Sequence, residues 1–295
     1  MEKIKYTIII PNKNNKVLLD RLLDSIPMRD DIQIVIVDDN SDNMDFNDYP
    51  GQGRNNVIHI FTKEGKGAGY ARNVGINYAI GDWILFADSD DFYVKGAFDI
   101  LDTYTSNISY DVIYYNIESV NSLTFEKSDR NKNYSKYIKM YLDNKDPSGE
   151  YIRFRKWEPW NKLINRDFLI KNNIRCDEIP RCNDMMLSLL ISYHAKSFFV
   201  ISDKIYCVTY NPGSITRKKI KKDVFLNCVI CEIKKNYLYG IIKHNSWKTM
   251  FIYITLCLLK NNGLIDTVAM YAYLFKNRDK LHNARLSCLK IFEKV

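Results

Sequence analysis

The sequence has no hydrophobic run long enough to cross a membrane. The most apolar candidate, residues 250–259, is about ten residues long, whereas a helix needs roughly 20 apolar residues to span a bilayer. The first residues, Met1-Glu2-Lys3-Ile4-Lys5, lead directly into a strand-like stretch at 6–10, and the apolar core of a signal peptide is absent. We therefore expect a cytoplasmic protein with neither a secretion signal nor a transmembrane helix.

Soft-metal ligands are also scarce. The four histidines are scattered, and the seven cysteines are irregularly spaced. Cys228-x-x-Cys231 has no second cysteine pair or nearby histidine, which argues against a zinc site. These cysteines are expected to be reduced, partly buried thiols. The sequence shows no internal repeat and no low-complexity tract.

The charge is distributed unevenly along the chain. Hydrophobic residues make up 46% of the 295 residues and charged residues 26%, which is typical of a globular protein. Residues 1–118 hold 11 basic and 19 acidic residues, whereas 217–295 hold 16 and 5. A basic tail of this kind suits an anionic partner, either phospholipid or nucleic acid. We expect a peripheral contact with an anionic membrane surface and no nucleic acid; a solvated face at 217–222 is the alternative.

Strand-like and helix-like stretches alternate through the first 118 residues. Buried strands are predicted at 6–10, 32–37, 57–61, 83–87 and 111–116, with helices at 18–26, 68–79 and from 97. This alternation predicts an α/β fold with a mostly parallel sheet. Residues 121–150 are polar and predict a mobile surface loop or lid. Helical periodicity dominates from 224 to 295.

Three carboxylates follow the apolar run at 83–87. Asp88, Asp90 and Asp91 crowd the carboxyl end of a predicted strand, where parallel sheets bind ligands. Like charges repel there unless a cation neutralises them, and Mg²⁺ and Mn²⁺ prefer oxygen ligands. A calcium loop is excluded because Phe92 and Tyr93 occupy its fifth and sixth positions. An acidic turn is the plain alternative to a metal-assisted nucleotide site.

Four ordered motifs make the chain resemble glycosyltransferase family 2, whose members have the GT-A fold. They are Thr7-Ile8-Ile9-Ile10-Pro11-Asn12-Lys13-Asn14, Ile34-Val35-Ile36-Val37-Asp38-Asp39-Asn40-Ser41, Gly67-Ala68-Gly69-Tyr70-Ala71-Arg72-Asn73-Val74-Gly75 and Phe86-Ala87-Asp88-Ser89-Asp90-Asp91. Weaker matches follow at Trp160-Asn161-Lys162-Leu163, Asn183-Asp184, Tyr206 and Ser214-Ile215-Thr216. The resemblance implies a glycosyltransferase domain at 1–216, with a nucleotide-sugar half at 1–118 and an acceptor half at 119–216. A basic helical region occupies 217–295.

The resemblance also implies roles for the donor residues. From the residues alone, either Asp38 or Asp39 can accept a hydrogen bond from a base N–H at a strand end; the resemblance selects Asp39, with a turn-forming Asp as the alternative. It assigns Pro11 and Arg72 to the donor nucleotide, Asp88 to the ribose and Asp90 to Mg²⁺ or Mn²⁺. An ion pair with Asp88 or Asp39 is a compatible structural role for Arg72.

The acceptor side is implied by the Asn183-Asp184 pair. Asp184 holds the position of the family's general base, and a helix cap is its structural alternative. Asn183 replaces the usual Glu, which puts the acceptor contact of that residue in doubt. Asp91 is expected to touch the acceptor or to cap the next helix. Trp160 is a candidate for stacking on an acceptor sugar, as are Trp157, Tyr206 and Tyr210, although core packing is the alternative for each.

Together these residues predict an inverting, metal-dependent glycosyltransferase. It would move a sugar from a nucleotide-sugar, expected to be a UDP-sugar, to a hydroxyl of a glycan or lipid-linked glycan in bacterial surface-polysaccharide synthesis. Its site would lie on the cytoplasmic side of the membrane. Two alternatives stay open: a nucleotidyltransferase, and a non-catalytic protein that binds glycans or nucleotides.

Overall fold

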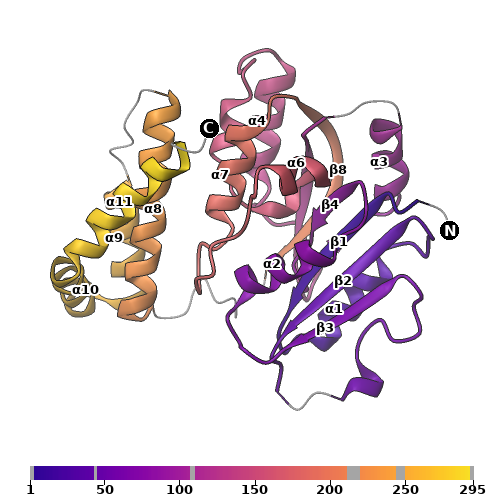
Figure 1. Cartoon of the computed structure of the whole chain (residues 1–295), viewed down its shortest axis with the longest axis horizontal. Coiled ribbons are helices and arrows are strands. Elements are labelled where there is room, and N and C mark those ends of the chain that lie inside the picture. Colours follow the sequence, from indigo (N-terminus) through magenta and orange to yellow (C-terminus); the bar gives the residue numbers. More distant parts are fainter. Residues whose placement is uncertain (1–2, 43–44, 107–109, 211–219, 244–249, 293–295) are drawn as a thin grey trace.

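The computed structural model describes residues 3–42, 45–106, 110–210, 220–243 and 250–292 (Figure 1). The strands are β1 (Tyr6–Asn12), β2 (Ile32–Asp39), β3 (Val57–Thr62), β4 (Trp83–Phe86), β5 (Phe92–Tyr93), β6 (Val112–Asn121), β7 (Lys162–Asn165) and β8 (Phe198–Tyr210). The helices are α1 (Lys16–Asp24), α2 (Ala68–Tyr78), α3 (Ala97–Thr105), α4 (Lys132–Leu142), α5 (Glu150–Phe154), α6 (Arg166–Lys171), α7 (Met185–His194), α8 (Lys222–Lys243), α9 (Met250–Asn262), α10 (Leu264–Lys276) and α11 (Arg278–Phe292), with short 3₁₀ turns η1 (Phe46–Asp48) and η2 (Pro159–Asn161).

The eight strands form one mixed sheet in the order β3-β2-β1-β4-β7-β6-β8-β5. The four strands β1 to β4 run parallel to one another. The strand β7 joins them antiparallel to β4, and β6 and β8 pair in parallel beyond it. The predicted α/β fold with a mostly parallel sheet is therefore confirmed. In its N-terminal half, β1 to β4, every strand pair is parallel.

Alternate residues of β2 pack under different helices, as expected for a strand buried on both faces. Ile34 and Ile36 join the main core with Leu19 and Leu22 of α1. Val35 and Val37 lie on the other face, in a small cluster with Ala71 of α2. The two helices thus cover opposite faces of the parallel strands (Figure 1), and the strand ends stay open between them.

The prediction of a mobile loop or lid at 121–150 is wrong. Helix α4 occupies the middle of this segment and packs against β6 and β8. Tyr134 and Ile138 are each only 2% exposed, and their spacing of four residues places them on one helix face. In the sequence these two apolar residues stand among many Asn, Lys and Ser residues, so the buried face of the helix is difficult to recognise. Asp146 then accepts the N–H groups of Glu150 and Tyr151 and fixes the start of α5.

In the described part of the chain after the sheet, the helices α8, α9, α10 and α11 form a group beside α7 (Figure 1). Met185, Met186 and Leu189 of α7 share a buried cluster with Cys231 of α8 and Cys288 of α11. The predicted helical C-terminal region is confirmed. Residues 211–219, which contain the predicted boundary at 216 and Arg217-Lys218-Lys219, lie outside the described residues. Among the described helices, none combines the length and the apolarity that a membrane crossing requires.

Candidate active site

Polar side chains follow the carboxyl ends of three neighbouring strands. β2, β1 and β4 lie side by side and point the same way, so their ends open at one edge of the sheet. Asp39 is the last residue of β2, and Asp88 lies two residues beyond the end of β4. Arg72 reaches Asp88 from α2. The edge is where open α/β sheets bind ligands.

Asp38 and Asp39 have different surroundings. Both oxygens of Asp38 accept hydrogen bonds, from the N–H and hydroxyl of Ser41 at 2.7 and 2.6 Å and from the Tyr49 hydroxyl at 2.6 Å. Asp39 accepts one hydrogen bond, 2.8 Å from the N–H of Gly67, while its Oδ1 is buried and has no partner among the described residues. Of the two, Asp39 is therefore the carboxylate with an oxygen left for a ligand.

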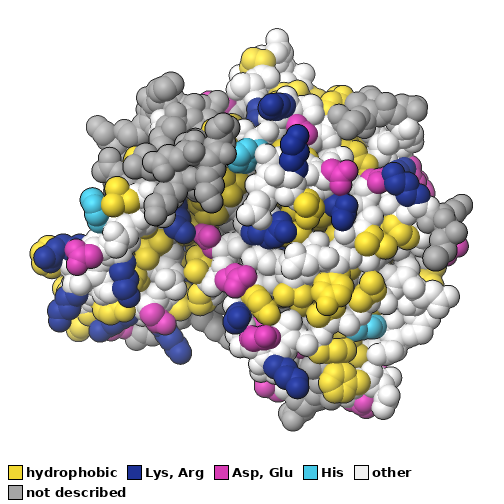
Figure 2. Space-filling model, viewed as in Figure 1, with side chains coloured by type: hydrophobic (Ala, Val, Ile, Leu, Met, Phe, Trp, Pro, Cys, Tyr) yellow, Lys and Arg dark blue, Asp and Glu magenta, His cyan; other side chains and the backbone are white. Residues whose placement is uncertain are grey.

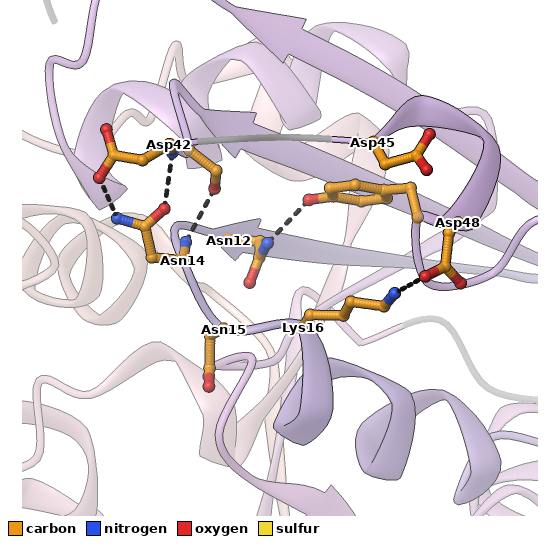
Figure 3. A pocket seen from close by; sticks show the side chains of 9 residues that line it. Asn12, Asn14, Asn15, Lys16, Asp42, Asp45 and Asp48 are labelled. Atoms are coloured by element: carbon orange, nitrogen blue, oxygen red, sulfur yellow. Dashed lines mark hydrogen bonds and ion pairs between the residues drawn. The ribbon is translucent and has the colours of Figure 1, made fainter.

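A pocket of about 560 Å³ opens beside these strand ends (Figure 3). Asn12, which follows the buried Pro11, donates to the hydroxyl of Tyr49 at 2.7 Å on its wall. Asn15 donates to the hydroxyl of Ser89 at 3.0 Å and so joins the pocket to the Asp88–Asp90 turn. The lining residues are Asn12, Asn14, Asn15, Lys16, Ser41, Asp42, Asp45, Asp48 and Tyr49. The donor role of Pro11 stays a prediction.

Arg72 joins the donor and acceptor motifs. The residue is 5% exposed. One Nη donates to Asp88 Oδ1 at 2.6 Å and the other to Asn183 Oδ1 at 2.7 Å. Burial opposes the charge on Arg72, but Asp88 and neighbouring acidic groups outweigh it and raise the pKa of the guanidinium. The predicted ion pair with Asp88 is confirmed. The amide oxygen of Asn183 accepts the second hydrogen bond of Arg72 without carrying a negative charge; its contact with an acceptor stays a prediction.

Gly69 allows this arrangement. A Cβ at this position would lie 2.2 Å from the carbonyl oxygen of Asp177 and 2.8 Å from Cβ of Asn183. The loop that carries both residues is closed on itself by the N–H of Asp177, which donates to the carbonyl of Asn183 at 2.9 Å. Only glycine lets this loop lie directly against α2. The close approach brings Asn183 to Arg72.

The turn after β4 is held by β8. The hydroxyl of Thr209 donates to the carbonyl of Asp90 at 2.6 Å, and its N–H donates to Asp91 Oδ1 at 2.7 Å. Asp91 is 2% exposed, and its buried carboxylate has Thr209 as its hydrogen-bond partner. The alternative that it caps the next helix is wrong, because Gly96 holds that position in α3. Its contact with an acceptor stays a prediction.

The carboxylates of this turn repel one another. Burial, and then the neighbouring Asp88, raises the pKa of Asp90. Burial, Asp90 and Asp88 together raise the pKa of Asp91 well above its usual range. In the described part of the chain, His, Cys, Asp and Glu nowhere gather in a group of three able to hold a metal. One or two carboxylates plus substrate phosphates are a usual magnesium ligand set, and the crowded Asp88 and Asp90 fit that set.

Asp184 immediately precedes α7. It occupies the N-cap position, yet its side chain makes no capping hydrogen bond, so the helix-cap alternative does not account for its carboxylate. The residue is partly exposed. Burial raises the pKa of Asp184 to about 6, with Arg72 lowering it and Glu158 and Asp88 raising it further. A carboxylate with such a pKa is suited to proton transfer near neutral pH.

The aromatic candidates for acceptor stacking are mostly packed inward. Trp160 is 5% exposed, and its ring stacks on the buried Tyr206 at a centroid distance of 5.9 Å. The hydroxyl of Tyr206 accepts the N–H of Asp88 at 2.9 Å. Trp157 packs beside Met185 of α7. Trp160 and Tyr206 therefore support the turn after β4 from the core, and the acceptor role of Trp160 stays a prediction.

The sequence does not indicate that Lys162 is buried. It is fully buried in β7, and its Nζ donates to the carbonyls of Lys156 and Glu158 and to Asn161 Oδ1, at 3.3, 2.6 and 2.9 Å. Burial lowers its pKa to about 7, although Glu158 and Asp184 oppose the shift. The buried ammonium fixes the segment that contains Trp160. Its sequence signal is the weak match at 160–163.

Comparisons with curated proteins give distant bacterial relatives. The chain is 28% identical over 213 residues to the poly(ribitol-phosphate) beta-N-acetylglucosaminyltransferase TarS of Staphylococcus aureus, a match that covers 69% of this chain and 35% of TarS. It is 30% identical over 174 residues to the GalNAc(5)-diNAcBac-PP-undecaprenol beta-1,3-glucosyltransferase of Campylobacter jejuni, with 56% of each chain covered. The chain thus spans about a third of the length of TarS.

Solved structures share the fold. The crystal structure of S. aureus TarS 1-349 in complex with UDP-GlcNAc superposes with a TM-score of 0.59 at 17% identity, covering 97% of this chain and 92% of that one. The same protein in complex with UDP gives a TM-score of 0.57. At this identity the likeness shows the fold, which is the predicted GT-A type. The protein-family description "Glycosyl transferase family 2" matches residues 7–172, more than half of the chain, and the protein therefore belongs to glycosyltransferase family 2.

Proposed function

We propose that the protein is an inverting glycosyltransferase that moves a sugar from a UDP-sugar to an acceptor hydroxyl. The observation that carries the proposal is the bridge made by Arg72 between Asp88 on the donor side and Asn183 beside Asp184. Through it, a carboxylate with a pKa of about 6 is held near the strand ends that carry the donor motifs. This arrangement supports a general base that deprotonates an acceptor next to a bound nucleotide-sugar.

The donor would lie along the ends of β1, β2 and β4. The unpartnered Oδ1 of Asp39 would accept an N–H of the base, and Asp88, whose side chain is 34% exposed, would reach the ribose. UDP is proposed because the TarS structures of this fold hold UDP and UDP-GlcNAc. Asp90 would hold a Mg²⁺ or Mn²⁺ ion, with Asp88 nearby. When bound, such an ion would stabilise the negative charge on the leaving diphosphate.

Asp184 would take the proton of the acceptor hydroxyl. The acceptor oxygen would then attack the anomeric carbon on the face opposite the diphosphate, so that one bond forms as the other breaks. A single displacement inverts the configuration and gives a β-linked product from an α-linked donor. Asn183 would orient Asp184 through its bond to Arg72. No covalent intermediate on the protein is required.

The acceptor is proposed to be a bacterial surface glycopolymer or a lipid-linked glycan. The names of two relatives support this class, since one acts on poly(ribitol-phosphate) and another on an undecaprenol-linked glycan. The reaction would take place at the cytoplasmic face of the membrane. The protein would contact the surface of an anionic bilayer through its C-terminal helices, without crossing the bilayer.

Exposed side chains of α9 and α10 support that contact. Ile265, Val268 and Phe275 are 85%, 61% and 70% exposed, and their spacing places them, with Ala272, along one side of α10. Arg278 lies over the ring of Phe275 at 5.1 Å. Exposed basic residues flank the stripe at Lys260, Lys276, Arg278 and Lys280. Figure 2 shows hydrophobic and basic side chains side by side at this end of the molecule. Such a surface suits anionic headgroups over an apolar layer.

The proposal is tested by incubating the protein with UDP-sugars, Mn²⁺ and a polyol-phosphate or lipid-linked acceptor, and by identifying the nucleotide released. Release of UDP supports a glycosyltransferase, whereas release of pyrophosphate would support a nucleotidyltransferase. Asp184→Asn should abolish transfer while donor binding, followed by calorimetry, is retained. If donors bind and neither product forms with any acceptor class, the non-catalytic alternative is favoured.

A further inference from the structure

Two thiols meet beside the predicted base. Cys182 lies in the loop before α7, and its Sγ is 3.7 Å from Sγ of Cys228 in α8. Both are free cysteines and both are partly exposed. The third thiol nearby, Cys231, is fully buried, and its Sγ points to the carbonyl of Cys182 and to the sulfur of Met185. Of these three neighbouring cysteines, Cys182 and Cys228 are therefore the two that a small reagent can reach.

Cys228 has the character of the attacking thiol. The hydrogen bond from Cys182 lowers the pKa of Cys228, burial opposes this, and Arg181 lowers it again. The thiolate is the nucleophile in thiol–disulfide exchange. Cys182 supplies the proton in this hydrogen bond, and the same contact raises its own pKa. Cys228 is thus the thiol that reacts first with an oxidant, and Cys182 is the thiol that then completes the disulfide.

We infer that Cys182 and Cys228 form a reversible disulfide. This disulfide lowers the transferase activity by displacing the loop before α7, which carries Cys182 and Asn183. The oxidant is a low-molecular-weight disulfide. The Cys228 thiolate attacks one of its sulfurs, breaks its S–S bond and releases one thiolate. Cys182 then attacks Sγ of Cys228, and the second small thiol leaves with the proton of Cys182. The two cysteines lose two electrons in total, and the small disulfide gains them as two thiols.

We expect closing this bond to move the loop before α7. A disulfide requires an S–S distance of about 2.05 Å, which is shorter than the present 3.7 Å. Cys182 has a φ of +58°, a left-handed conformation that a non-glycine residue keeps only where its surroundings fix it. The next residue, Asn183, accepts from Arg72, and Arg72 holds Asp88. A displacement at Cys182 is therefore passed to both sides of the active site.

The consequence for activity rests on the proposed function, whereas disulfide formation does not. Misplacing a catalytic group by about 1 Å can cost on the order of 100-fold in rate. We expect oxidation to lower the transfer rate by about tenfold or more, with little change in the sheet, and dithiothreitol to restore it. The tethered helix α8 also contacts the loop through Lys234, whose Nζ lies 3.8 Å from Asp177.

The test treats the whole protein with oxidised glutathione and maps its peptides by mass spectrometry without reduction. The expected result is a peptide linked through Cys182 and Cys228 and a reversible loss of transfer. Cys228→Ser should give no linked peptide and keep its activity under the same treatment. Cys231→Ser is the matched control, one helical turn away, and should oxidise like the unchanged protein.

Three results overturn the inference. One is a map that shows only Cys228 joined to Cys231, or only a glutathione adduct. A second is a complete Cys182–Cys228 link with transfer unchanged. A third is equal inactivation of the unchanged protein and Cys228→Ser. If no variant transfers sugar under reducing conditions, the proposed function fails instead, and the peptide map still decides whether the disulfide forms.

Discussion

Nη2 of Arg72 lies 2.6 Å from Oδ1 of Asp88, and the two ends of this ion pair differ in exposure. The arginine side chain is 6% exposed and the aspartate side chain 34%. The buried guanidinium holds the carboxylate from the core side, so the other oxygen of Asp88 can face a ligand. A buried arginine that loses this partner would be left as an unpaired charge.

Arg72→Lys should weaken donor binding. A lysine has one ammonium on a flexible stem and cannot hold Asp88 and Asn183 in the fixed fork of a guanidinium. Loss of one charged hydrogen bond costs about 1.5–3 kcal/mol, which corresponds to about 10- to 160-fold in affinity. Calorimetry with UDP and Mn²⁺ measures the change. Lys66→Arg is a control on an exposed side chain near the same helix; a Kd equal to that of the control would contradict the role of Arg72.

The transfer rate should fall as the pH drops through about 6. Burial raises the pKa of Asp184 to about 6, and a general base acts only when deprotonated, so its protonation removes activity on the acid side. The rate constant kcat at saturating donor and acceptor, measured from pH 4.5 to 8, should therefore show this acid limb. An acid limb near pH 4, the ordinary value for an aspartate, would contradict the assignment of Asp184.

The parallel half of the fold and the order of its motifs are predictable from the sequence. The strands β1, β2 and β4 are continuous apolar runs because both faces of the sheet are covered. Each run ends in the polar residues of a motif. Local sequence therefore suffices to place Asp39, Asp88 and Asp90 at one edge.

The other half depends on contacts between distant residues. β6 pairs with β8 from Val112–Phe198 to Asn121–Tyr210, and nothing local in either segment indicates that partner. Within the site, Asp38 accepts a hydrogen bond from the hydroxyl of Tyr49, which lies beyond the end of its strand. Nothing in the sequence around Asp38 indicates this partner, so the structure supplies the physical reason why Asp39, which the resemblance selects, has an oxygen left for a ligand.

Gly69→Ala should disturb the acceptor loop. Alanine suits a helix, but its Cβ would lie 2.2 Å from the carbonyl oxygen of Asp177, and overpacking of this kind costs about 1–3 kcal/mol. We expect a lower free energy of unfolding by urea, together with a lower kcat as Asn183 shifts. Asn77→Ala is the control, since Asn77 is an exposed position of the same helix. Unchanged stability and kcat in the Gly69 variant would show that the loop can move aside.

Ile265→Glu and Val268→Glu should release the protein from anionic vesicles. Both side chains lie on the exposed stripe of α10, and burying such a side chain contributes about 1.5–3 kcal/mol, so each change should weaken binding by roughly tenfold or more. Cosedimentation with phosphatidylglycerol vesicles measures this, with phosphatidylcholine vesicles for comparison. Leu123→Glu is the matched control, because Leu123 is 79% exposed and follows β6, away from α10. Equal binding to both lipids would contradict an electrostatic contact, because basic flanks attract only anionic headgroups. Concentration-dependent dimerisation that is lost in the α10 variants would instead assign the stripe to a second copy of the chain.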